Sequence, residues 1–197
     1  MNMQRIPEEG NRRIVVLGGS FDTGKTTIFE QIQKDFGERY RYIPDHTKKN
    51  MEAEPLCHYD IDIMREVYRR SIIDHVVDEM NNDGRLTIAD GSLIDIAARS
   101  QFVLDTNDFV WLNRHLMERD EKGMYAYLKF PLIIAPDAPD GQQRANYHHR
   151  IDRTLRLNRG VRVEKISKHL EEFTARYARV LLLVRHYERL MLGGTSR

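Results

Sequence analysis

A glycine-rich segment near the start of the chain has the spacing of a phosphate-binding loop. Gly19, Gly24, Lys25 and Thr26 satisfy the pattern G-x-x-x-x-G-K-[ST]. Glycines let the backbone curl so that successive N–H groups point at phosphate oxygens, and a helix that begins at Lys25 adds the positive end of its dipole. We expect Lys25 to reach the terminal phosphates of a nucleoside triphosphate and Thr26 to bind Mg²⁺ through its hydroxyl.

Contacts to the bound nucleotide are expected along the whole loop. The candidate cofactor-binding residues in it are Gly19, Ser20, Phe21, Asp22, Thr23, Gly24, Lys25, Thr26 and Thr27. ATP and Mg²⁺ are the cofactors that such a loop predicts. The competing interpretation is a glycine-rich turn that binds nothing. The complete motif, between a strand of the buried type and a helix, favours phosphate binding.

The sequence around the loop predicts the strand and the helix that must hold it. Residues 14–17 are continuously apolar, as expected for a strand covered on both faces, and residues 25–36 follow as a helix that Gly37 ends. Further apolar runs predict strands at 40–43, 86–89, 132–135 and 160–166, with helices at 61–80, 92–104, 108–119 and 167–192. An irregular, arginine-rich stretch is expected between 137 and 159.

This alternation predicts an α/β protein with a three-layer P-loop NTPase fold, in which helices flank a five-stranded, mainly parallel sheet. The 197 residues suit a single domain, 1–197, with a polar tail at 1–11. The net charge of +1 gives no global field toward nucleic acid, and the lone Cys57 fits a reducing compartment. No segment could cross a bilayer, so we expect a cytoplasmic protein with no membrane partner, in the host cytoplasm if its source is viral.

Acidic residues follow three of the expected strands, at the edge of the sheet where ligands bind in doubly wound folds. They are Asp45, Asp90 and Asp137. Asp90 could hold Mg²⁺ through water, as a carboxylate after an apolar strand does in P-loop proteins, or it could contact an acceptor. The competing interpretation is a helix N-cap, although Ser92 could fill that position. The candidate metal residues are therefore Thr26 and Asp90.

Two strand ends carry a family resemblance. The second expected strand ends in Ile43-Pro44-Asp45, and the third ends in Asp90 before a polar residue and a helix. Together with the loop, these elements resemble the thymidylate-kinase and deoxynucleoside-kinase group of P-loop kinases, except that Gly91 replaces their usual arginine. Residues 130–140 resemble the turn into that group's arginine-rich lid, here at about 137–160. Residues 151–163 also resemble nicotinamide-riboside-kinase-type P-loop proteins.

The resemblance implies roles for a further carboxylate and for the arginines. Asp45 would lie near the acceptor hydroxyl as a base or an orienting group, unless it only caps a turn. A lid would close over the phosphates and stabilise the charge of transfer, unless its arginines form a solvated loop. The candidate catalytic residues are Lys25, Asp45, Asp90, Arg150 and Arg153, and Arg144 joins the nucleotide-binding residues.

The resulting prediction is an ATP-dependent kinase that transfers the γ-phosphoryl group to a nucleoside or nucleotide, with a pyrimidine preferred. Arg99 and Gln101, on the helix after Asp90, are candidate acceptor contacts. The rings of Phe109, Trp111 and Tyr125 could stack on the acceptor, unless they belong to the core. The partner is then a small substrate, and a homodimer is left open.

Two alternatives to that activity stay open. The same chemistry could act on a hydroxymethylated pyrimidine base within DNA, because Lys48 and Lys49 make the corner after Asp45 basic and Gly91 leaves the site without an arginine. The second alternative, from another class, is a regulatory P-loop NTPase switch that hydrolyses its nucleotide without an acceptor.

Overall fold

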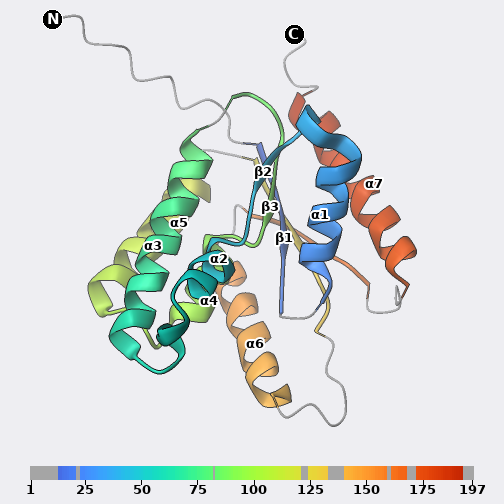
Figure 1. Cartoon of the computed structure of the whole chain (residues 1–197). Coiled ribbons are helices and arrows are strands. Elements are labelled where there is room, and N and C mark those ends of the chain that lie inside the picture. Colours follow the sequence, from blue (N-terminus) through green and yellow to red (C-terminus); the bar gives the residue numbers. More distant parts are fainter. Residues whose placement is uncertain are drawn as a thin grey trace, which may run out of the picture.

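The computed structural model describes residues 13–20, 23–81, 83–120, 124–132, 140–158, 161–167 and 172–192. Its described strands form one parallel sheet in the order β2-β3-β1-β4-β5 (Figure 1). The strands are β1 (Arg13–Gly18), β2 (Arg41–Ile43), β3 (Thr87–Asp90), β4 (Met124–Lys129) and β5 (Arg162–Lys165). The fold class expected from the sequence, a parallel α/β sheet flanked by helices, is therefore confirmed.

Helices cover both faces of the sheet. The α-helices are α1 (Lys25–Phe36), α2 (His46–Ala53), α3 (Ile61–Met80), α4 (Leu93–Ser100), α5 (Thr106–Asp120), α6 (Gly141–Leu157) and α7 (Phe173–Leu192), and the short 3₁₀ helices are η1 (Gly37–Arg39) and η2 (Pro55–His58). Figure 1 shows α1 and α7 together on one side of the sheet, α3 and α5 on the other, and α6 beyond the end at which β1 leads toward α1.

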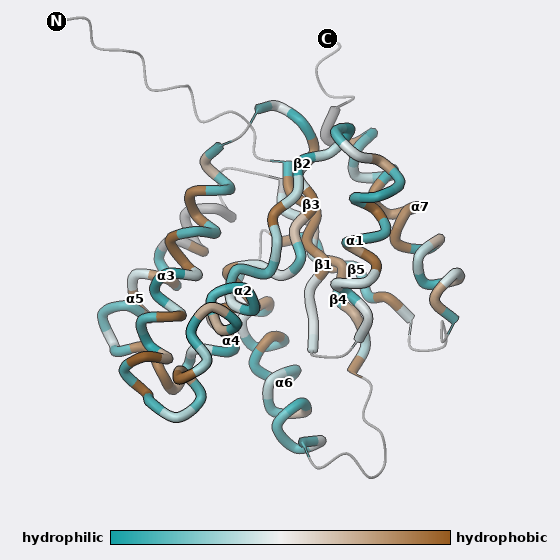
Figure 2. The backbone as a smooth tube through the Cα atoms, viewed as in Figure 1, coloured by the Kyte–Doolittle hydropathy of each residue, from teal (hydrophilic) through white to brown (hydrophobic). Residues whose placement is uncertain are grey.

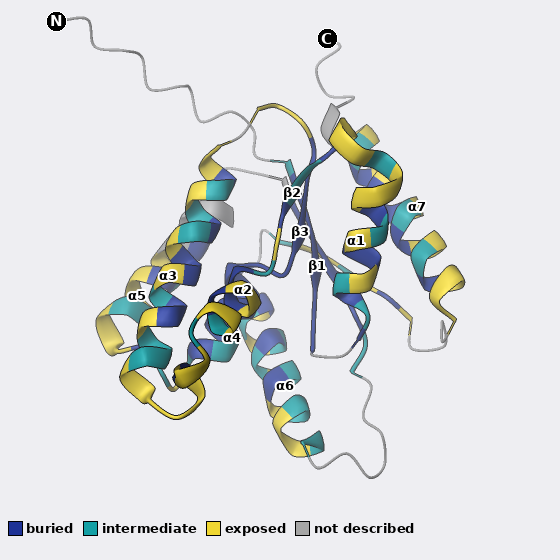
Figure 3. Ribbon diagram, in the orientation of Figure 1, coloured by how far each residue is buried: buried dark blue, intermediate teal, exposed yellow. Residues whose placement is uncertain are grey.

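The central strand divides its side chains between two cores because successive residues of a strand point to opposite faces. Ile14 and Val16 pack with side chains of α3, α4, α5 and α6, whereas Val15 and Leu17 pack with those of α1 and α7. The hydrophobic brown stretches of the strands in Figure 2 and their dark-blue colour in Figure 3 show that the sheet is the buried interior. The end of β1, from which the phosphate loop departs, is thus fixed from both sides.

The fourth strand is a correction to the sequence analysis, which expected it at 132–135. The strand is Met124–Lys129, Leu132 lies in no helix or strand, and Ile133, Ile134 and Ala135 are outside the described residues. Its run of tyrosine, alanine and leucine is not a plain aliphatic run, yet Ala126, Tyr127 and Leu128 are completely buried between the helical layers. Pro131 then follows, and a proline cannot donate to the sheet ladder.

The arginine-rich stretch is a second correction. It was expected to be irregular, but residues 141–157 form the helix α6, which packs against α4. The buried side chains Tyr147, Ile151 and Leu155 recur every four residues and form one apolar face of α6. The arginines of α6 lie outside this apolar face, so they do not prevent a packed helix.

Candidate functional site

The phosphate-binding loop joins the carboxyl end of β1 to the start of α1, as the motif predicts. Ser20 and Thr23 are buried, and Gly24 has the left-handed φ of 80° that glycine adopts without strain. The N–H groups at the start of α1 lie next to this turn and give the loop the anion-binding geometry of a helix N-terminus. Phe21 and Asp22 lie outside the described residues, and Thr27 is exposed.

Lys25 is folded into the loop. Its ammonium donates hydrogen bonds to the carbonyl oxygen of Ser20 at 2.5 Å and to the Thr23 hydroxyl at 3.4 Å. Both partners are uncharged, so among the described residues the ammonium has no ion-pair partner. Burial lowers the pKa of Lys25, against the opposing effect of nearby carboxylates such as Asp95. A phosphate group bound in the loop would add a negative charge beside this ammonium.

Thr26 and Asp90 lie together at the adjoining strand ends. Asp90 is paired in register with Leu17, and the next residue, Gly91, donates its N–H to the Leu17 carbonyl at 2.9 Å. Burial raises the pKa of Asp90 to about 6, and a hydrogen bond with the Thr26 side chain opposes that rise. The Thr26 hydroxyl and the Asp90 carboxyl are oxygen ligands of the kind that bind divalent cations, and a bound cation would favour the ionised form of Asp90.

The turn after Asp90 has a conformation that favours glycine at position 91, where the resemblance to thymidylate kinases led us to expect arginine. Gly91 has a φ of 81°, in the left-handed region that an L side chain rarely adopts. Ser92 then caps α4, because its hydroxyl accepts from the N–H groups of Ile94 and Asp95. The backbone conformation therefore favours glycine at this position. The positively charged side chain in this part of the site comes from a residue farther along the chain.

That cation is Arg99, whose guanidinium forms an ion pair with Asp45 at 3.0 Å. Asp45 also caps α2 by accepting from the Lys48 N–H at 3.1 Å, so the capping interpretation of this residue holds alongside the ion pair. Burial alone would raise the pKa of the Asp45 carboxyl, but the Arg99 guanidinium and the Lys48 amide hold it below its ordinary value. Asp45 is thus an ionised carboxylate at neutral pH.

A cavity of about 510 Å³ connects the loop to this ion pair. Its lining residues are Lys25, Thr26, Asp45, Lys48, Met51, Glu52, Pro55, His58 and Arg99. They come from the phosphate loop, α2, η2 and α4, which meet here. The structure therefore brings the predicted site residues Lys25, Thr26 and Asp45 to one cavity, with Asp90 in contact with Thr26. Arg99, predicted as an acceptor contact, lines the same cavity.

The predicted lid arginines have contacts of other kinds. Arg144 pairs with Asp140 at 2.7 Å, four residues away on α6. Arg150 donates to the Ala98 carbonyl of α4 at 3.4 Å and lies over the ring of Phe102, whereas Arg153 is exposed. Their roles in catalysis and nucleotide binding stay predictions. Asp137, named with the other strand-end carboxylates, lies outside the described residues.

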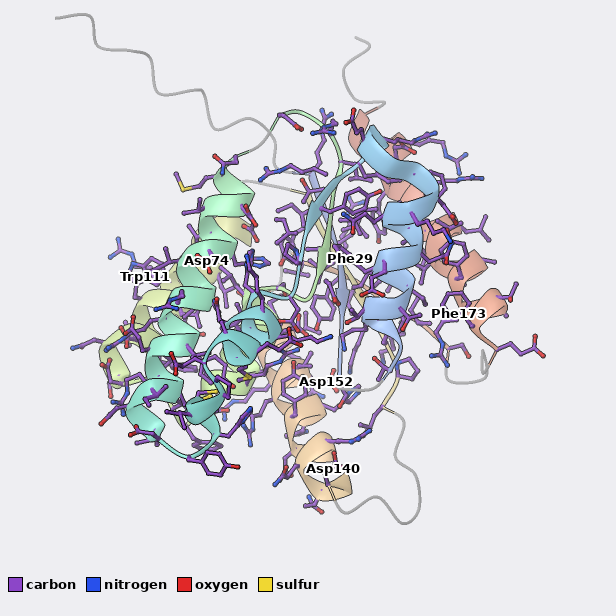
Figure 4. The ribbon with its side chains drawn as sticks, viewed as in Figure 1. Phe29, Asp74, Trp111, Asp140, Asp152 and Phe173 are labelled. Atoms are coloured by element: carbon purple, nitrogen blue, oxygen red, sulfur yellow. The ribbon has the colours of Figure 1, made fainter. Side chains whose placement is uncertain are left out.

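Lys129 and Asp152 join α6 to the sheet through an ion pair. In Figure 4 Asp152 lies at the end of α6 that is nearer the sheet, and Asp140 lies at the opposite end.

Trp111, suggested as a ring that stacks on the acceptor, is not among the residues that line the cavity of about 510 Å³. It lies on α5 and lines a separate depression of about 250 Å³ together with Ile73 of α3.

Sequence reasoning missed the buried polar residue at the centre of the site. Asp95 is 1% exposed and accepts hydrogen bonds from the Gly19 N–H at 3.1 Å and from the hydroxyl of Tyr127 at 2.8 Å. The signal was present, because Asp95 is the one ionisable residue in the apolar run 93–98. A charged residue within such a run is rarely buried without polar partners.

Comparison with known proteins supports the fold. Neither the family models nor the curated proteins contain a match to the chain. Two solved structures of NadR, one in complex with NR and one with NAD and AMP-PNP, superpose with a TM-score of 0.64 each over 89% of this chain. The fold is that of the P-loop NTPases. The sequence identities are 19% and 18%, and the chain spans about half the length of either NadR chain.

The likeness to NadR concerns the fold, and it does not single out the thymidylate-kinase group. The resemblance to the thymidylate-kinase group therefore stays a prediction.

None of the helices in the described part of the chain is long and apolar enough to span a membrane.

Proposed function

We propose that the protein is an ATP-dependent kinase that transfers the γ-phosphoryl group to a hydroxyl of a nucleoside or nucleotide. The observation that carries this proposal is one cavity that is lined both by Lys25 and Thr26 of the phosphate-loop motif and by the Asp45–Arg99 ion pair. A nucleotide-hydrolysing switch needs only the first of these two parts. A phosphotransferase also needs a second pocket in which a carboxylate faces the acceptor.

The donor side would hold ATP through the loop amides and Lys25. Thr26 and Asp90 would hold Mg²⁺, which neutralises phosphate charge when bound. The contact between their side chains and the raised pKa of Asp90 fit that role, because a cation would favour the ionised carboxyl.

In the transfer step, the acceptor hydroxyl oxygen forms a bond to the γ-phosphorus. The bond from that phosphorus to the β–γ bridging oxygen breaks, and ADP leaves with the electron pair. The hydroxyl proton passes to Asp45 or to solvent. Because the Arg99 guanidinium keeps Asp45 ionised, its carboxylate accepts the hydrogen bond of the hydroxyl and aims the oxygen at the phosphorus.

The nature of the acceptor is proposed from two resemblances. The NadR structures were determined with NR and with NAD and AMP-PNP, ligands that suit a nucleoside-type acceptor beside a nucleotide site. The pyrimidine preference rests on the thymidylate-kinase resemblance. Gln101, suggested as a base contact, is half-buried at the end of α4 and does not belong to the cavity lining given above.

The DNA alternative depends on a basic corner after Asp45. Lys48 lines the cavity, but Glu52 of the same helix lies 4.0 Å from its ammonium and partly offsets its charge. This favours a small acceptor over a polyanion, whose binding would also fall steeply with salt concentration.

The decisive experiment offers the protein Mg²⁺, γ-labelled ATP and four kinds of acceptor in parallel: nucleosides, nucleoside monophosphates, nicotinamide riboside, and DNA that contains a hydroxymethylated pyrimidine. The proposal predicts that label enters a free nucleoside or nucleotide. Label in the DNA would support the DNA-modifying alternative. Release of labelled phosphate at the same rate with and without every acceptor would overturn the kinase proposal in favour of the switch.

A further inference from the structure

A continuous set of hydrogen bonds runs from the phosphate loop to the acceptor carboxylate. It begins at the Gly19 N–H, passes through Asp95, Tyr147 and Arg99, and ends at Asp45. The members come from the loop, α4, α6 and the start of α2, which are far apart in the sequence. The set therefore joins the two halves of the proposed site through the interior of the protein.

At the donor end, Asp95 is fully occupied as an acceptor. Its Oδ1 receives the Gly19 N–H at 3.1 Å and the hydroxyls of Tyr127 at 2.8 Å and Tyr147 at 3.4 Å. Its Oδ2 receives the hydroxyl of Ser92 at 2.8 Å. Donors on several sides fix the carboxylate, and the carboxylate in turn fixes the backbone of Gly19, the first glycine of the motif.

At the acceptor end, Tyr147 fixes Arg99. Its hydroxyl oxygen accepts from Arg99 Nε at 3.1 Å, and the guanidinium lies 5.7 Å from the centre of the Tyr147 ring. With Nε engaged in this way, Nη1 donates to both carboxylate oxygens of Asp45, at 3.0 and 3.3 Å. A planar guanidinium held at one edge can present its other edge in only one direction.

We propose that Asp95 and Tyr147 are positioning residues that hold the donor and acceptor halves of the site in a fixed position relative to each other. Asp95 does so at the Gly19 backbone. Tyr147 does so through Arg99, and because Tyr147 belongs to α6, the packing of α6 on α4 sets the orientation of the acceptor carboxylate. This inference deepens the kinase proposal and rests on it for its catalytic consequence.

The first test does not require an active kinase. The titration of Asp45 is followed by carboxyl ¹³C NMR in the full chain, with Asp45→Asn to assign its signal. Tyr147→Phe keeps the buried ring and removes only the hydroxyl that holds Arg99. We expect the midpoint of Asp45 to move upward by about 1 pH unit, because a loosened guanidinium stabilises the carboxylate less.

The matched control is Tyr187→Phe. Tyr187 is also buried, but it belongs to α7 on the opposite face of the sheet and its hydroxyl donates to Glu164 at 3.4 Å. The Asp45 midpoint should stay unchanged in this variant. An unchanged midpoint in a folded Tyr147→Phe protein would overturn the role of Tyr147.

The second test separates the two positioning residues by function. Tyr147→Phe should lower kcat about tenfold and leave the Kd for ATP within about twofold, because the loop keeps its contact with Asp95. Asp95→Asn should weaken ATP binding about tenfold, because Gly19 loses a charge-assisted hydrogen bond. Equal effects of both variants on ATP binding would contradict the division of roles. Should no acceptor be phosphorylated, the kinase proposal fails, while the Asp45 titration and the ATP affinities still decide this inference.

Discussion

The two halves of the site are built in different ways. In the donor half, Lys25 contacts Ser20, five residues earlier, and Thr23, two residues earlier. In the acceptor half, Arg99 contacts Asp45 across 54 residues and Tyr147 across 48 residues. The Lys25 contacts of the donor half therefore need only the loop and the start of α1, although Asp95 of α4 also holds Gly19. The acceptor half exists only when α2, α4 and α6 are all in place.

The charges of the two halves are also held differently. Lys25 is a buried cation whose partners are uncharged oxygens of the loop, so burial lowers its pKa. Asp45 is a buried carboxylate whose pKa is kept low by a full ion pair. The proposed donor half would thus gain its opposite charge from a bound phosphate, whereas the charge of Asp45 in the proposed acceptor half is already neutralised by Arg99. Changes in one half should leave the binding function of the other largely intact.

The largest effect is expected from the donor half. Lys25→Met removes the cation that a bound phosphate would neutralise, so kcat/KM should fall about 10³-fold and ATP affinity should fall with it. Steady-state kinetics and equilibrium ATP binding measure the two quantities. Lys34→Met, at an exposed position in the last turn of α1, is the control and should change neither. Retained ATP affinity in Lys25→Met would mean that the loop is not the donor site.

Arg99→Leu should act on the acceptor half alone. Transfer should fall about 100-fold while the Kd for ATP changes little, because Asp45 loses the group that orients it. The variant also leaves a buried carboxylate without its partner, which costs about 3 kcal/mol of unfolding free energy at neutral pH.

The pH dependence of that loss follows from the sign of the Asp45 pKa shift. The folded pKa lies below the ordinary value, so the pair stabilises the protein at neutral pH and this contribution disappears as the pH falls through the lowered pKa. Urea denaturation should therefore show a smaller difference between Arg99→Leu and the unmodified protein at about pH 3 than at about pH 7. An equal difference at both would contradict the ion-pair explanation. Arg156→Leu, at an exposed position of α6, is the control.

A smaller effect is expected from Asp90, which lies beside Thr26 in the proposed donor half. Its folded pKa is raised to about 6, so the protein without metal gains stability from Asp90 at acid pH and loses it as the pH rises toward that value. The loss should amount to about 2 kcal/mol between about pH 4 and pH 7, and Asp90→Asn should remove it. Urea titrations in a chelator give the measurement. The same slope in both proteins would assign the effect to another group.

The donor half could be predicted from the sequence because its geometry is local. The spacing from Gly19 to Thr26 specifies the loop, and the apolar run of β1 specifies its support. The position of Asp45 was predicted from the strand end before it. Arg99 was named as an acceptor contact, but its ion pair with Asp45 was not predicted, because no local pattern states that a residue of α4 will face a residue at the start of α2.

Tertiary burial decided the elements that were predicted wrongly. Tyr127 belongs to β4, a strand whose two faces are both covered. The fourth strand was instead predicted at 132–135 because that run is aliphatic. Tyr147, Ile151 and Leu155 have helical spacing, but arginines at the intervening positions concealed it. For the same reason the contacts of Tyr147 were not predicted: its hydroxyl accepts from Arg99 and donates to Asp95.

Asp45→Asn gives the most direct measurement of the division between the two halves. ATP binding and phosphoryl transfer are measured side by side on this variant, with the acceptor that the labelling experiment identifies. The amide keeps the shape of the side chain and the cap of α2 but cannot accept the hydroxyl proton. ATP should bind within about twofold of the original affinity while transfer falls at least about 100-fold. Unchanged transfer would remove Asp45 from the mechanism and contradict the assignment of the acceptor half.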